Sequence, residues 1–132
     1  MANNYCQTSA YLPIHEKDFE QAENIVNRVT AEISRDSDEY EEEFGDCGVG
    51  VEVEKTGVWF NGEESFDQES LIQIAQALLD ELEIDTPFYF SWAYTCSKLR
   101  LDEFGGGAGV VRRGEEPYTI DAMQEVIGFV ER

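Results

Sequence analysis

The sequence predicts an α+β fold: an antiparallel or mixed sheet with helices packed on one face. Two observations predict this class. Segments with apolar residues at every third or fourth position alternate with short β-prone runs, in the order β-α-β-β-α-β-β-α. Hairpin-like connections between several of the strands favour antiparallel pairing, with the helices segregated to one side. The length of 132 residues suits a single acidic domain over 1–132.

The chain begins with a predicted strand and a predicted helix. Residues 5–12 form a β-prone run that Pro13 ends. Residues 16–33 then carry one apolar stripe at helical spacing, with acids on the opposite side. The stripe consists of Phe19, Ala22, Val26, Val29 and Ile33.

A hairpin is predicted next. Residues 47–62 read as two strands around a turn near Lys55, and Asn61-Gly62 is a closing turn signal. The alternation places the valines inward and the glutamates outward. The inward residues are Val49, Val51 and Val53, and the outward residues are Glu52 and Glu54.

The second helix and the following strand have the strongest patterns. Residues 64–85 carry a helical stripe, with Asp67 as a plausible N-cap. The stripe consists of Leu71, Ile74, Ala75, Leu78 and Leu82. After Pro87, the aromatic run 88–97 is strongly β-prone and is expected to be an internal strand with Trp92 buried.

The last third is predicted as a loop, two short strands and a helix. The glycines of 105–109 indicate a mobile loop before a strand at 109–113. Residues 118–120 form a second strand, and 121–132 form a helix with an Asp121 capping box. Its predicted inward residues are Met123, Val126, Ile127 and Val130. The first six elements match the split βαβ, or ferredoxin-like, succession, which says little about function.

The net charge of −20 is concentrated in the middle of the chain. Residues 36–97 hold 17 acids and a single base, Lys55, whereas the rest of the chain holds 12 acids and 8 bases. From Lys98 to Arg113 the balance reverses, with four bases against two acids. We therefore expect an electrically lopsided molecule.

Motifs for catalysis or metal binding are weak. His15 is the single histidine and stands at a predicted helix start, where an exposed first-turn residue is the simpler interpretation. Cys6, Cys47 and Cys96 could join His15 around zinc, but they lack any short paired spacing. We predict reduced core thiols, no metal, no cofactor and no enzymatic activity, with a small enzyme using His15, a cysteine or the glycine-rich loop as an alternative.

Two ligand-loop interpretations also fail on spacing or context. Asp36 and Asp38 fit positions 1 and 3 of a calcium loop, but Cys47 stands where its bidentate glutamate is required. The glycines of 105–109 could cradle an anion beside Arg112 and Arg113. Phosphate-binding glycines open a helix, however, and these lead into a β-prone run.

No secretory signal or membrane-spanning stretch is evident in the sequence. Together with the scattered cysteines, this predicts a soluble protein of the cytoplasm. The segment "SWAYTCSKLRLDEFGGGAGVV", residues 91–111, is similar to a segment of small uncharacterised proteins carried on phages and plasmids. That resemblance implies a mobile-element origin and transfers no functional residue. The charge profile resembles that of acidic inhibitor proteins such as anti-restriction and anti-CRISPR DNA mimics.

The acid-rich stretch predicts a binding surface for a basic partner. Carboxylates two apart on a strand or four apart on a helix lie roughly 6–7 Å from each other, similar to phosphates along a nucleic-acid strand. We expect one face that occupies a Lys/Arg-rich groove of a nucleic-acid-handling complex, without binding nucleic acid or membrane itself. Its predicted residues are Asp36, Asp38, Glu39, Glu41, Glu42, Glu43, Asp46, Glu52, Glu54, Glu63, Glu64, Asp80, Glu81 and Glu83. An acidic or salt-adapted housekeeping domain is the alternative.

Overall fold

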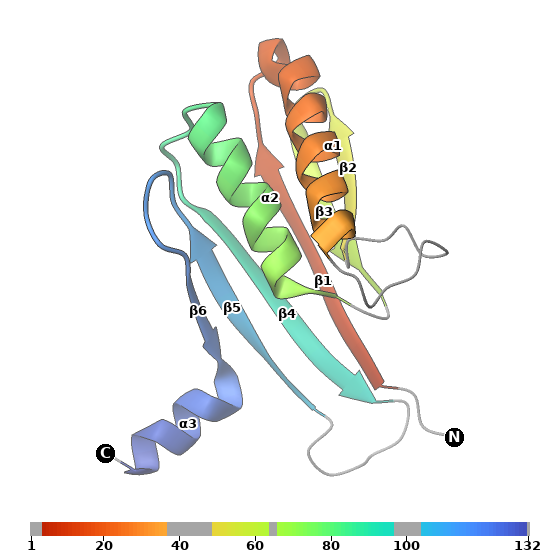
Figure 1. The fold of residues 1–132 in the computed structure, drawn as a ribbon. Helices are drawn as coiled ribbons and strands as arrows, with labels where there is room; N and C mark the ends of the chain where they lie inside the picture. Colours follow the sequence, from red (N-terminus) through yellow and green to blue (C-terminus); the bar gives the residue numbers. More distant parts are fainter. Residues whose placement is uncertain (1–3, 37–48, 64–65, 97–103, 132) are drawn as a thin grey trace.

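The computed structural model describes residues 4–36, 49–63, 66–96 and 104–131. A six-stranded antiparallel sheet forms one layer, and two helices cover one of its faces (Figure 1). The strands are β1 (Asn4–Pro13), β2 (Gly50–Glu54), β3 (Gly57–Gly62), β4 (Phe88–Cys96), β5 (Gly105–Val111) and β6 (Tyr118–Asp121). The helices are η1 (Glu16–Asp18), α1 (Phe19–Asp36), α2 (Gln68–Glu81) and α3 (Ala122–Glu131). The predicted α+β class and the predicted order of elements are confirmed.

The strands lie in the order β2-β3-β1-β4-β5-β6, and every neighbouring pair is antiparallel. β1 therefore stands between β3 and β4, which are far from each other in sequence. The order of the first four strands is compatible with the split βαβ succession. β4 pairs with β1 on one side and β5 on the other, so the prediction of an internal strand at 88–97 is confirmed.

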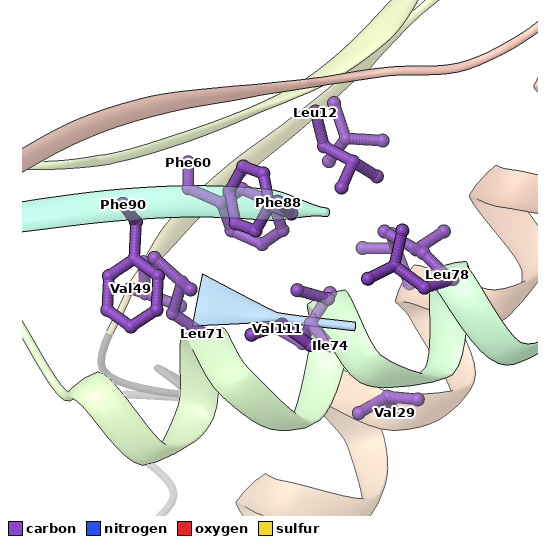
Figure 2. Packing of buried hydrophobic residues seen from close by; sticks show 14 of the residues in the cluster. Leu12, Val29, Val49, Phe60, Leu71, Ile74, Leu78, Phe88, Phe90 and Val111 are labelled. Atoms are coloured by element: carbon purple, nitrogen blue, oxygen red, sulfur yellow. The ribbon is translucent and has the colours of Figure 1, made fainter. Parts of the chain in front are cut away.

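The hydrophobic core lies between the helices and the sheet (Figure 2). The stripes of α1 and α2 face alternate residues of the strands, as the two periods require. Buried strand residues include Leu12, Val58, Phe60, Phe88, Phe90, Trp92 and Val111, and buried helix residues include Ala22, Ile25, Val26, Val29, Leu71, Ile74, Ala75, Leu78 and Leu79. Three aromatic pairs connect Phe60, Phe88, Phe90 and Trp92 in a row, with ring centroids 5.6 to 6.2 Å apart.

Helix α2 begins and ends at recognisable signals. Asp67 is its N-cap, as predicted, and its carboxylate accepts a hydrogen bond from the Glu69 amide at 3.2 Å. At the other end, the Ile84 amide donates to the Leu79 carbonyl at 2.9 Å, which closes a Schellman-type turn. Glu83 occupies the left-handed position of this turn with φ of 56°, where glycine is usual.

Two predictions about the last third are wrong. Residues 105–109 belong to strand β5, which runs from Gly105 to Val111, and do not form a loop. Helix α3 exists and is capped by the Asp121 carboxylate, which accepts from the amides of Met123 and Gln124 at 3.1 and 3.2 Å. However, α3 has no buried residue, so the side chains predicted to face inward lie on the surface. Those side chains are Met123, Val126, Ile127 and Val130.

The prediction of a closing turn at Asn61-Gly62 is also wrong. Both residues pair with β1 and are the last two residues of β3. Among the described helices, none has the length and apolar composition needed to cross a membrane.

Candidate partner-binding surface

Glu52 and Glu54 project from β2, which is an edge strand of the sheet. Both glutamates are exposed, whereas the alternating residues Val51 and Val53 pack against the core. The predicted alternation along this strand is therefore confirmed. The glutamates therefore stand on the face that α1 and α2 leave uncovered. No described cation forms an ion pair with either of them or with exposed Glu63 beyond β3.

The acids around the end of α2 are held by other groups. Asp80 accepts hydrogen bonds from the Gly114 amide at 2.8 Å and from the Gln76 side chain at 3.1 Å. Glu81 forms a two-pronged ion pair with Arg28 of α1. These contacts tie α2 both to α1 and to the turn between β5 and β6.

Arg113 forms ion pairs with two further acids at the same end of the molecule. Its guanidinium lies 3.4 Å from a Glu83 oxygen and 3.0 Å from an Asp85 oxygen. Arg112 pairs instead with Glu115 at 3.0 Å. The local excess of negative charge near the end of α2 is therefore partly neutralised within the protein.

The ion pair between Arg28 and Glu81 favours the ionised form of the Glu81 carboxyl. The hydrogen bond from the Arg28 guanidinium holds the pKa of the Glu81 carboxyl below its ordinary value. The pair is exposed, so solvent screens its contribution to stability. Its structural effect is to fix the end of α2 beside the middle of α1.

The described acids do not share one face. Asp36 ends α1 eight residues beyond Arg28, which is about 12 Å further along the helix axis. The end of α1 and the end of α2 consequently lie toward opposite ends of the molecule (Figure 1). Glu52 and Glu54 lie on the other side of the sheet from both helices. The remaining predicted residues, Asp38, Glu39, Glu41, Glu42, Glu43, Asp46 and Glu64, lie outside the described residues.

The glycine-rich segment has a structural explanation. Gly107 and Gly109 are the registered partners of Trp92 and Phe90, and the aromatic rings lie where their β-carbons would stand. The glycines therefore accommodate aromatic side chains of the core. A phosphate loop is not formed, since these residues are extended strand and the arginines that follow are paired with carboxylates.

The other candidate chemical groups are dispersed. His15 is exposed just before η1 and its side chain makes no capping hydrogen bond. Cys6 and Cys96 are half-buried thiols without a disulfide, and burial raises the pKa of the Cys6 thiol. Cys47 lies outside the described residues. No cluster of metal ligands occurs within the described parts of the chain.

Sequence reasoning missed the character of the uncovered sheet face. On β1, β3, β4, β5 and β6, the side chains that alternate away from the helices include no charged residue. Several are aromatic, including Tyr11, Trp59 and Tyr89. The sequence does contain this information: in each strand, the residues that alternate with the buried ones are the residues of the uncovered face. On β2, by contrast, the side chains on this face include the carboxylates of Glu52 and Glu54.

Comparison with known proteins gives no relative: no family model, no curated protein and no solved structure matches the chain. The similarity of residues 91–111 to phage and plasmid proteins therefore stays a prediction. The same holds for the resemblance in charge profile to DNA mimics.

Proposed function

We propose that this chain is a non-enzymatic acidic binding protein that occupies a Lys/Arg-rich groove on a nucleic-acid-handling complex. It would act as a nucleic-acid-mimicking inhibitor of the anti-restriction or anti-CRISPR type, in the cytoplasm. The partner would gain by counterion release and by electrostatic steering, as it does with nucleic acid.

The distribution of ion pairs carries this proposal. Arg28 and Arg113 form ion pairs with acids at or just beyond the end of α2. Glu52 and Glu54 have no described cation within ion-pair distance. These two glutamates lie about 6.8 Å apart along an edge strand. The chain that leads into this strand is the acid-rich run 36–46. We therefore place the contact at the β2 edge together with that run, and assign the acids at the end of α2 to structure.

The test compares two charge reversals of equal size. One variant carries Glu52→Lys and Glu54→Lys. Its control carries Glu23→Lys and Glu116→Lys, which are exposed, have no described ion pair and lie outside 36–97. Wild-type protein and both variants are immobilised, and proteins from a bacterial lysate are captured at low salt and identified.

We expect the wild-type protein and the control variant to capture the same nucleic-acid-binding protein, and the β2 variant to capture at least tenfold less of it. An added DNA or RNA oligonucleotide should displace this partner from the wild-type protein, and high salt should release it. Equal binding by both variants, or a partner that nucleic acid does not displace, would favour a generally acidic domain and contradict mimicry.

A further inference from the structure

The two edges of the sheet differ in a way that bears on association. A strand edge is open to pairing with another chain, and charged side chains on it discourage such pairing. The β2 edge carries Glu52 and Glu54. At the other edge of the described sheet, β6 presents exposed Tyr118 and Ile120. β6 is four residues long, which by itself limits strand pairing. Its single acid, Asp121, caps α3, so the two edges differ in the polarity of the side chains that they expose on the open face.

The apolar character continues directly into α3. This helix lies beyond the end of β6 and away from α1 and α2 (Figure 1), and none of its residues is buried. Seven of the eleven large hydrophobic side chains that the described residues expose lie between 118 and 130. They are Tyr118, Ile120, Met123, Val126, Ile127, Phe129 and Val130. We call this set the C-terminal apolar surface.

The uncovered sheet face extends the same surface. Tyr118 pairs in register with Val110, which in turn pairs with Tyr89, so the three lie in one row across β6, β5 and β4. Tyr89 on β4 and Tyr118 on β6, on either side of β5, are 71% and 61% exposed. The row joins the edge of the sheet to an uncharged part of its open face.

We propose that a second copy of this chain covers the C-terminal apolar surface, forming a two-fold symmetric dimer. A two-fold interface places the same patch against itself, so the patch must be self-complementary. Apolar surfaces meet this requirement, whereas like-charged surfaces do not. The seven side chains expose on the order of 800 Å², close to the roughly 800 Å² that each partner buries in a standard interface.

If two copies of this acidic protein associate, the C-terminal apolar surface is the place where their charges oppose contact least. Two molecules of −20 repel each other strongly wherever their acids face one another. Between 118 and 130 the sequence holds two acids, Asp121 and Glu125, and Asp121 caps α3 with its carboxylate. A Lys/Arg-rich partner would instead be drawn to the acid-rich edge. The two surfaces therefore suit different partners.

The test is the mass of the full chain in solution, measured by sedimentation over a range of protein and salt concentrations. Val126→Lys with Phe129→Lys places two cations in the apolar surface, and Gln73→Lys on the exposed side of α2 is the control. The double substitution changes the net charge from −20 to −18, so it lowers the repulsion between copies. A loss of association can then be assigned to lost apolar contact.

We expect wild type and Gln73→Lys to sediment at twice the monomer mass and the double variant at the monomer mass. Since α3 buries no side chain within the monomer, the variant should retain its circular dichroism and unfold cooperatively. Its melting temperature should not depend on protein concentration, whereas that of a dimeric wild type should rise with concentration. A milder variant, Phe129→Ser, should raise the dimer dissociation constant by at least tenfold. A wild-type protein that stays monomeric up to hundreds of micromolar, or a double variant that dimerises as wild type does, overturns the proposal.

Salt separates this inference from the proposed function. Screening reduces the repulsion between two acidic copies, so the dimer should tighten as salt rises. The contact with a basic partner should weaken under the same change. A dimer that dissociates at high salt would overturn the apolar interface while leaving the acidic one untested by that result.

Discussion

Phe90 on β4 lies directly against Gly109 on β5, its partner in the strand register. A β-carbon at Gly109 would stand 2.6 Å from Phe90 Cζ and 2.9 Å from the Thr119 side chain. The aromatic ring thus occupies the space that a side chain on β5 would need. Phe90 is 4% exposed, so the ring cannot move aside into solvent.

Gly109→Ala should therefore destabilise the fold. Because the ring is buried, relief of the overlap requires shifts in packed side chains, which cost about 1–3 kcal/mol. Gly128→Ala in α3 is the matched control, because nothing lies within 4 Å of its added β-carbon and alanine favours a helix. Urea unfolding followed by circular dichroism should show a lower midpoint for Gly109→Ala and no loss for Gly128→Ala. Equal midpoints would contradict the packing described above.

Glu83 gives a prediction in the opposite direction. A residue with a β-carbon in the left-handed region costs about 1–2 kcal/mol, and glycine avoids this cost at an entropic penalty of about 0.5–1 kcal/mol. Glu83→Gly should therefore raise the free energy of unfolding by up to about 1 kcal/mol, despite losing the ion pair with Arg113. Glu83→Gln, which keeps the β-carbon, should give no gain. Chemical denaturation of both variants decides the matter, and a destabilised glycine variant would refute the strain argument.

Glu81 predicts a dependence of stability on pH. The hydrogen bond from Arg28 lowers the pKa of its carboxyl in the folded state. A depressed pKa contributes stability that is present above the unfolded value, about 4.3, and is lost as pH falls through the folded value. Glu81→Gln should therefore lower the melting temperature slightly at pH 7, with the difference vanishing once the pH has fallen below the lowered pKa of the folded state. A difference that is unchanged at low pH would show that the carboxylate is not responsible.

The succession of the first four strands and two helices could be predicted because most of these segments have a clear period. Leu71, Ile74 and Leu78 recur at helical spacing and are fully buried. The glycines of β5 could not be predicted as a strand in the same way, because glycine has a low intrinsic preference for strands. Their placement depends on the aromatic rings of another strand. Likewise, the apolar pattern of α3 shows that something should cover the helix but not which surface does so.

The candidate site was predictable only in part. Alternation along 50–54 correctly placed Glu52 and Glu54 outward. The pattern of charge along the chain shows which acids are neighbours in sequence, but it does not show which cations the fold brings to the acids at the end of α2. Arg28 stands 53 residues from Glu81 and Arg113 stands 30 residues from Glu83. Only the fold brings these pairs together.

This division of the acids leads to the last prediction, which compares two neutralisations that each remove two charges. Glu83→Gln with Asp85→Asn removes carboxylates that Arg113 already compensates. Glu52→Gln with Glu54→Gln removes carboxylates that no described cation compensates. Uncompensated charges contribute more to the field at a basic groove, so the β2 pair should weaken a captured partner severalfold more than the α2 pair.

The measurement is the dissociation constant of the purified partner at low salt for wild type and both variants. A third variant, Glu41→Lys with Glu42→Lys and Glu43→Lys, extends the comparison to the acidic run and should lose binding by orders of magnitude. Each affinity should fall as salt rises, with the shallowest slope for the variants that bind least. If removing Glu83 and Asp85 weakens the partner as much as removing Glu52 and Glu54, the compensation by Arg113 does not shield those acids. The contact would then have to include the end of α2, and the β2 edge would lose its special role.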